Sequence, residues 1–304
     1  MPHPQHHRTL GFLSCAIACA FWGSGFFFGK IALTELQVGH MVLYRFLFGT
    51  LALSPFLFTH DSKLNAKEWR ILLLSAFLGI PFQFLVQFKG LSLTTVSHAS
   101  LMIGTMPVIL AIGAAIFAHE RMDRTGWIAI AASTCGAALI ALSSRHAVGN
   151  HASLTGDLLV VLSLVIALFW ILLNKHLLVR HSAVVVTTRV VATGTLMLAA
   201  IVIPTEGWPP IARLSPKVWA ALIISGIFCT ALTTLAWNWG ISKVPASQAG
   251  VLINMEPLVG SLLGIFVLGE TLGPSAWIGA SLILAAAVTL TTHSTTKVKA
   301  PMAL

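Results

Sequence analysis

Residues 89–122, KGLSLTTVSHASLMIGTMPVILAIGAAIFAHERM, align without a gap with residues 239–272, WGISKVPASQAGVLINMEPLVGSLLGIFVLGETL. Apolar segments match by chance, but Gly, Ser, Pro and Glu do not recur by chance at a fixed offset, so the chain contains an internal repeat. The matched pairs are Gly90 with Gly240, Ser92 with Ser242, Ser97 with Ser247, Ala99 with Ala249, Ile103 with Ile253, Pro107 with Pro257, and Glu120 with Glu270.

The whole chain is too apolar for a soluble globular protein. Its 304 residues are 57% hydrophobic and only 9% charged, and their mean hydropathy is +0.89. Soluble domains carry about 25% charged residues, and disordered chains have low hydropathy. In lipid only helices and closed β-barrels provide hydrogen-bond partners for all the backbone N–H and C=O groups. Residues 10–33 and 41–58 are continuously apolar rather than alternating, which predicts a helical membrane protein.

Ten segments provide the roughly 20 apolar residues that a helix needs to cross the hydrocarbon core. The connections between them are short, so no extramembrane catalytic domain is expected. The ten segments are 10–33, 40–59, 69–90, 96–118, 125–143, 155–175, 182–204, 216–240, 246–268 and 274–292.

The ten segments divide into two sets of five, residues 1–147 and 148–304. Because five is odd, the second set enters the membrane from the opposite side. The sequence therefore predicts an all-α integral membrane protein with ten transmembrane helices in two inverted five-helix repeats. Inverted repeats are typical of secondary transporters, in which substrate binds near the midplane between the halves.

The distribution of Lys and Arg predicts that both termini are cytoplasmic. Eleven basic residues fall on the side assigned to the cytoplasm, and five fall on the other side. The first group is Arg8, Lys63, Lys67, Arg70, Arg121, Arg124, Lys175, Arg180, Lys243, Lys297 and Lys299, and the second is Lys30, Lys89, Arg145, Arg213 and Lys217.

Two features of the chain, the duplicated segment and the Phe-Trp pairs that end at Trp22 and Trp170, resemble the EamA family of the drug/metabolite transporter superfamily. Within that family, the chain is similar to bacterial inner-membrane exporters of aromatic and other amino acids. The resemblance covers nearly all of the chain and is sharpest from Met255 to Glu270. The first copy departs from the pattern, with Met106 at the position of Glu256. The resemblance implies ten helices, cytoplasmic termini and efflux of small metabolites without ATP.

Other functional classes have less support. No phosphate-binding G-x-x-x-x-G-K-[ST] loop occurs, and the spans lack the convergent acids and histidines of a membrane enzyme. We therefore expect no catalysis, cofactor or metal. The net charge of +9 is explained by basic residues that orient helices, so nucleic acid is not an expected partner. A channel-like passive facilitator of small metabolites is the alternative to a carrier.

Polar and aromatic residues inside spans are the candidate substrate-binding residues, since polar groups in lipid usually face a cavity or a partner. Gln83 and Gln87 share a helix face by their spacing. Glu256 is the one acid near the centre of a span, and it either binds an ammonium group, exchanges a proton, or caps the backbone opened by proline. The full set is Trp22, Gln83, Gln87, His98, Trp170, Trp237, Asn254 and Glu256. A cavity lined by the first, third, fourth, sixth, eighth and ninth spans is expected.

A second set of residues is predicted to have structural or gating roles. Arg45 and Arg189 lie short distances into corresponding spans, where they snorkel to the interface, pair with an acid, or bind a carboxylate. By depth, Arg45 pairs with Glu270 and Arg189 with Glu120. Pro107 and Pro257 are expected to break their helices in mid-span, as static kinks or as gating hinges.

The predicted partners are a small-molecule substrate, the lipid bilayer, protons through Glu256, and a second copy of the chain. The fifth and tenth spans are the poorest in polar residues. They are therefore expected to lie at the periphery or at a homodimer contact.

Overall fold

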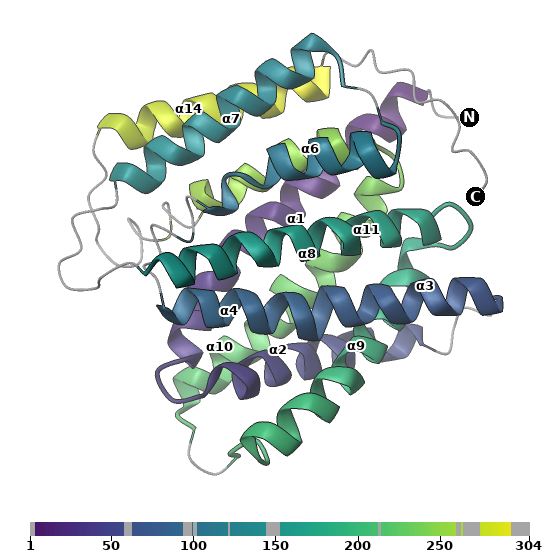
Figure 1. Ribbon diagram of the computed structural model, residues 1–304, viewed down its shortest axis with the longest axis vertical. Coiled ribbons are helices and arrows are strands. Elements are labelled where there is room, and N and C mark those ends of the chain that lie inside the picture. The colour runs from purple at the N-terminus through teal and green to yellow at the C-terminus, as the bar shows by residue number, and fades with distance from the viewer. Residues whose placement is uncertain are drawn as a thin grey trace.

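The computed structural model describes residues 4–57, 63–93, 99, 102–120, 122–143, 153–211, 214–259, 263 and 274–292, and within these ranges it contains helices and no strand. Figure 1 shows α3 and α4 running end to end beside α8. The α-helices are α1 (Pro4–Ala32), α2 (Val38–Leu53), α3 (Ala66–Phe77), α4 (Gln83–Leu93), α6 (Met106–Phe117), α7 (Arg124–Ser143), α8 (Leu154–Leu177), α9 (Ala183–Glu206), α10 (Pro216–Gly226), α11 (Thr233–Ile241), α12 (Ala246–Val251) and α14 (Pro274–Thr292).

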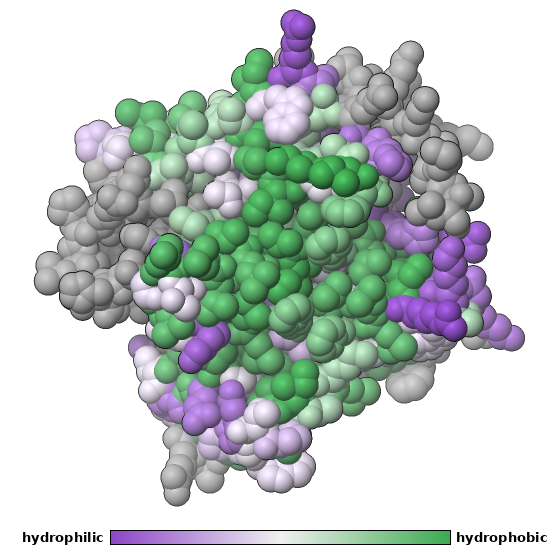
Figure 2. Space-filling model, viewed as in Figure 1, coloured by the Kyte–Doolittle hydropathy of each residue, from purple (hydrophilic) through white to green (hydrophobic). Residues whose placement is uncertain are grey.

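Five helical stretches within these ranges are long and apolar enough to cross a membrane: His7–Gly29, Ala66–Leu93, Leu154–Leu177, Ala183–Glu206 and Pro216–Ile241. Shorter apolar helices accompany them. Figure 2 shows hydrophobic side chains across the centre of one face, with hydrophilic ones gathered toward its edges. The prediction of an all-helical, multi-pass membrane protein is confirmed, whereas the number of ten spans stays a prediction.

The third and eighth predicted spans contain π-helical segments that the sequence analysis did not expect. The segment η2 (Leu78–Phe82) joins α3 to α4, and η3 (Ile227–Leu232) joins α10 to α11. Pro81 lies inside η2, but η3 contains no proline. A π-helical turn bonds i to i+5, so it leaves a backbone carbonyl without its usual helical donor. The two segments lie at corresponding places in the repeat.

The two repeat prolines do not kink continuous helices as predicted. α6 begins at Met106, with Thr105 before it, so Pro107 occupies its first turn. There the missing N–H costs no hydrogen bond. In the second repeat, the 3₁₀ turn η4 (Leu252–Asn254) separates α12 from the helical turn that contains Pro257. The ninth segment is therefore divided near its middle.

The helices α7 and α14 pack against each other along one edge of the bundle (Figure 1). A Cβ atom at Gly136 would lie 2.6 Å from the carbonyl oxygen of Gly279, so glycine permits this close approach. The outward faces of both helices are apolar, and Trp127 and Trp277 are 45% and 56% exposed. The peripheral position agrees with the low polarity of these spans, and the homodimer contact stays a prediction.

A chain of buried polar side chains joins four helices in the interior. Ser75 Oγ of α3 donates to Asn174 Oδ1 of α8 at 2.6 Å. Asn174 Nδ2 donates to Asn238 Oδ1 of α11 at 3.3 Å, and Asn238 Nδ2 donates to Thr187 Oγ1 of α9 at 2.9 Å. All four side chains are buried. Because no water competes here, each lost partner leaves an unsatisfied polar group.

Replacement of Asn238 by Leu is expected to lower the free energy of unfolding by about 1–2 kcal/mol, since interhelical hydrogen bonds in membrane proteins contribute about 0.6 kcal/mol each and unpaired groups add to the loss. Thermal unfolding in detergent measures this. Ser163→Ala is the matched control, because the buried Ser163 hydroxyl bonds only Val160 O of its own helix. Equal unfolding midpoints for both variants would show that the hydrogen bonds of Asn238 do not hold the helices together.

Candidate functional site

A cavity of about 80 Å³ lies in the interior of the bundle, with walls from both repeats. Trp22 of α1 and Trp170 of α8 lie on its wall, as do Gln83 and Gln87 of α4 and Glu256. The second and seventh predicted spans also contribute, through α2 and α9, although the sequence analysis had not placed them there. The cavity is therefore the structural feature that brings most of the candidate residues together.

Three tryptophans form a cluster beside the cavity. The ring centroids of Trp22 and Trp170 lie 6.3 Å apart in an edge arrangement, and those of Trp22 and Trp237 lie 5.2 Å apart. Trp237 is fully buried behind Trp22 and is not on the cavity wall. A Cβ atom at Gly79 would collide with the Trp170 ring, so glycine in η2 admits the indole. The cluster thus fixes the aromatic side of the cavity.

Arg45 is buried in the interior and does not snorkel to the interface as predicted. Its side chain is held by Nε, which donates to Thr230 Oγ1 at 2.8 Å, and by Nη2, which donates to the Cys229 carbonyl oxygen at 2.7 Å. The guanidinium carbon lies 5.3 Å from the centroid of the Phe84 ring, a cation–π distance. Since Cys229 belongs to the π-helical η3, its carbonyl is available to an outside donor. The proposed partner Glu270 lies outside the described residues.

Glu256 faces the cavity and is only partly buried. Its carboxylate makes no hydrogen bond and no ion pair with any described residue, so it does not cap the backbone at Pro257. A Cβ atom at Gly23 would lie 2.5 Å from the Glu256 carbonyl oxygen, which shows that α1 packs directly on this turn. The carboxylate is thus positioned by its backbone and left open to the cavity.

The remaining predicted binding residues lie elsewhere. Asn254 is buried, and its Nδ2 donates to Ser133 Oγ of α7 at 3.0 Å, away from the cavity. The cause is the 3₁₀ turn at η4, which tightens the helix just before Glu256. His98 lies outside the described residues.

Several residues on the cavity wall were not predicted from the sequence. Thr230 and Thr234 lie there together, and Ile80 and Phe84 occupy the corresponding places in the first repeat. The 150-residue offset of the repeat was the signal that could have found the threonines, once the face of Gln83 had been assigned.

An ionic cluster closes one end of the bundle, at the turn between α8 and α9. Lys175 Nζ donates to Glu120 Oε1 at 2.7 Å and to the Val244 carbonyl at 3.0 Å. The same carboxylate accepts the backbone N–H groups of Ala246 and Ser247 and the Ser247 hydroxyl. Glu120 therefore pairs with Lys175 and not with Arg189 as predicted. The reason is that Glu120 lies beside the last turn of α8, which contains Lys175.

The backbone conformation just after α6 places the Glu120 side chain in this cluster. Its amide N–H donates to the Ala114 carbonyl at 3.1 Å, and His119 has φ of 52°. A residue with positive φ directly after the last turn ends many helices, and glycine usually takes that position. Gly269 stands at the corresponding place in the second repeat.

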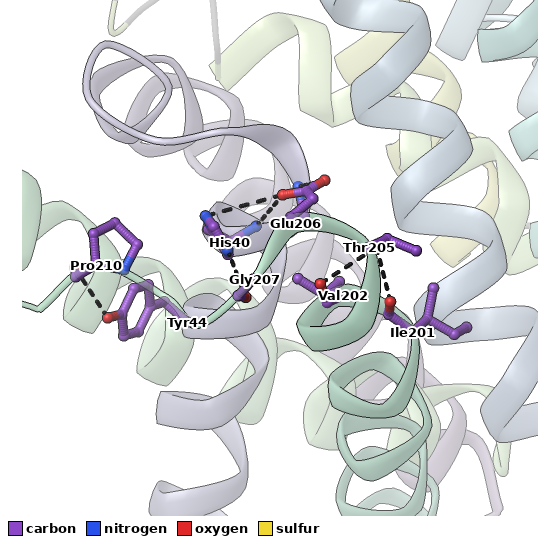
Figure 3. Close-up of polar contacts among 9 residues, drawn as sticks. His40, Tyr44, Ile201, Val202, Thr205, Glu206, Gly207 and Pro210 are labelled. Atoms are coloured by element: carbon purple, nitrogen blue, oxygen red, sulfur yellow. Dashed lines mark hydrogen bonds and ion pairs between the residues drawn. The ribbon is translucent and has the colours of Figure 1, made fainter.

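A second carboxylate joins helices at the opposite end of α9, as Figure 3 shows. Glu206 accepts the backbone N–H groups of Gly39 and His40 at 3.1 and 3.2 Å, at the first turn of α2. The His40 Nε2 atom lies 3.1 Å from the Gly207 carbonyl oxygen. Nearby, the Tyr44 hydroxyl donates to the Pro210 carbonyl at 3.2 Å. Carboxylates therefore clamp helix ends on both sides of the cavity.

The EamA-like transporter family matches residues 9–142 and again residues 154–292. Two matches of this extent cover most of the chain, so the chain belongs to the EamA-like transporter family. The family is described as one of transporters.

Two relatives of similar length are named as uncharacterized transporters. One, from Archaeoglobus fulgidus, is 24% identical over 260 residues, which cover 85% of this chain and 89% of the relative. Another, YetK from Bacillus subtilis, is 24% identical over 263 residues, 85% of this chain and 80% of the relative. A crystal structure with 16% identity superposes with a TM-score of 0.77 over 94% of this chain and 97% of the other, which supports the fold.

The ionic cluster at Glu120 predicts a stability that falls at low pH. Burial raises the pKa of this carboxyl, but the Lys175 charge and the Ser247 donors outweigh burial, so its pKa is below the usual value. A lowered pKa contributes stability that is complete above the unfolded value and is lost as pH falls through the folded one.

Glu120→Gln is expected to lower the free energy of unfolding at pH 7 by about 1–3 kcal/mol, because it removes hydrogen bonds to a charged group. Thermal midpoints in detergent from pH 7 to pH 3 should then fall less steeply than in the wild type. Lys175→Met removes the same pairing and should show a similar pH profile. Parallel profiles for the wild type and both variants would refute this role of Glu120.

Proposed function

We propose that this chain is a secondary transporter that exports amino acids, aromatic ones among them, or related small metabolites through the central cavity by alternating access. The supporting observation is that the cavity wall pairs residues from corresponding positions of the two repeats. These pairs are Trp22 with Trp170, Ile80 with Thr230, Phe84 with Thr234, Ile103 with Ile253, and Met106 with Glu256. A site built from both halves is what alternating access between inverted repeats requires.

The proposed topology has ten spans in two inverted repeats, residues 1–147 and 148–304. Both termini are cytoplasmic in a bacterial inner membrane, on the evidence of the basic residues that flank the spans. Matched relatives from Bacillus subtilis and Archaeoglobus fulgidus accord with a prokaryotic membrane. A C-terminal reporter that is active only in the periplasm would contradict this orientation.

A carrier and a channel-like facilitator are distinguished by transport kinetics. Proteoliposomes containing the purified chain should take up radiolabelled amino acids with saturation, and unlabelled substrate inside should stimulate uptake by counterflow. A pore gives neither effect, so linear, unstimulated uptake would replace the proposed carrier with a passive facilitator.

The tryptophan cluster provides the test that is specific to the cavity. Trp22→Ala and Trp170→Ala are each expected to reduce amino-acid uptake about tenfold or more, because loss of a large aromatic contact costs more than the 1.4 kcal/mol that corresponds to a factor of ten. Trp277→Ala is the matched control, since this side chain is 56% exposed on the outer face of α14. Uptake at wild-type rates by both cavity variants would rule out this substrate site.

Protons are the proposed coupling ion, since Glu256 is the only carboxyl residue on the described cavity wall. Wild-type transport should respond to an imposed pH gradient, and Glu256→Gln should abolish that response. Substrate exchange at saturating concentration should continue in this variant, because exchange needs only reorientation of the loaded carrier. A flat pH response in the wild type would remove proton coupling and leave facilitated diffusion.

A further inference from the structure

The described cavity wall carries one basic and one acidic side chain. Arg45 is its single basic residue, and Glu256 is its single acidic residue. The two do not form an ion pair with each other, although both reach the same space. A ligand that matches this wall has no net charge but carries two separated charges of opposite sign.

Arg45 presents unused hydrogen-bond donors to the cavity. Two of its nitrogens are engaged, Nε with Thr230 and Nη2 with the Cys229 carbonyl, and these bonds fix the plane of the guanidinium. Nη1 has no hydrogen-bond partner among the described residues, and it retains accessible surface. An oriented guanidinium with a free edge suits a carboxylate, which accepts two parallel N–H bonds.

Acceptors occupy another part of the same wall. The Glu256 carboxylate makes no hydrogen bond and no ion pair within the described structure. Gln83 is 8% exposed, and its Oε1 is buried without any hydrogen bond. An unpartnered buried acceptor costs free energy unless a ligand satisfies it. An ammonium group offers three donors, enough to bond both side chains.

We propose that the cavity binds zwitterionic molecules end to end, with the ligand's carboxylate on Arg45 and its ammonium group on Glu256 and Gln83. This assignment rests on the proposed transport function and names the residues that would recognise each charged end of its substrate. The ring of Trp22 and the ring of Trp170 lie on the same wall and contact the apolar part of the ligand. Molecules with only one of the two charged groups leave the other side chain unpaired, and the site rejects them.

Ligand-induced thermal stabilisation of the purified, full-length chain tests this selectivity. The probes form two matched series: L-phenylalanine, phenethylamine and 3-phenylpropionate, and L-leucine, 3-methylbutylamine and 4-methylpentanoate. At pH 7, each amino acid is expected to bind at least about tenfold more tightly than its decarboxylated or deaminated analogue. Equal or tighter binding of the analogues in both series would overturn the proposal, as would no binding by any of the six.

Glu256→Gln assigns the ammonium end. Because the carboxylate makes no hydrogen bond within the described structure, the variant is expected to fold. It should lose at least about tenfold in affinity for the amino acid, while its affinity for the deaminated analogue stays the same or rises. Glu35→Gln is the control, since this glutamate is exposed and bonds Ser215. An unchanged preference for the amino acid in Glu256→Gln would show that Glu256 does not hold the ammonium group.

Arg45→Lys assigns the carboxylate end and retains the charge while losing the planar fork. It should weaken binding of the amino acid and of the deaminated acid by similar factors and leave the amine unaffected. The exposed Arg180 provides the matched control, Arg180→Lys. Because Arg45 also bonds Thr230 and Cys229, folding of this variant is checked by its unliganded midpoint. If it does not fold, the Glu256→Gln preference and the wild-type series decide the proposal.

Transport measured in proteoliposomes separates this inference from the proposed function. Amino-acid selectivity in binding without any counterflow would support the zwitterion site and refute the carrier. Saturable counterflow of compounds that bear one charge only, with no binding of either amino acid, would support the carrier and refute the zwitterion site.

Discussion

The structure around the cavity depends on one buried interaction, the contact of Arg45 with the backbone of η3. A guanidinium in a membrane interior is costly unless its donors are satisfied, and here the Cys229 carbonyl and the Thr230 hydroxyl satisfy two of them. The π-helical turn makes that carbonyl available, because it breaks the regular i to i+4 pattern. The charge can therefore remain at the cavity wall with its remaining donors free to face the cavity.

The repeat provides the framework, and its departures from symmetry provide the chemistry. Corresponding positions line the cavity from both halves, yet Met106 stands opposite the acidic Glu256, and Ile80 stands opposite Thr230. A cavity with identical halves would carry charges in equal pairs. The change from Met106 to Glu256 leaves one acidic group, and Arg45 is on the wall whereas Arg189 is not, so one basic group remains. This pair is the electrostatic basis of the proposed recognition of a dipolar molecule.

Carboxylates also join helix ends above and below the cavity. Glu120 binds Lys175 and the start of α12, while Glu206 binds the start of α2. Each acid accepts backbone N–H groups that have no partner inside their own helix, and it adds negative charge where the helix dipole is positive. Contacts of this kind hold together helices that come from different repeats, so the proposed movement of one half against the other would change them.

The sequence by itself determined the helical membrane architecture and the internal repeat, because apolar length and fixed-offset polar matches can be read from the chain alone. Intramembrane polarity and aromatic residues also singled out Trp22, Trp170, Gln83 and Glu256, which the structure places on the cavity wall. Only the tertiary structure decided the partners of Arg45 and Glu120. It also showed that the side chain of Asn254 points away from the cavity, toward Ser133. These depend on backbone irregularities at η3 and η4 and on the way that helices distant in sequence meet. Predictions from hydropathy and residue spacing treat every helix as regular, so they could not reveal these irregular segments or the contacts that depend on them.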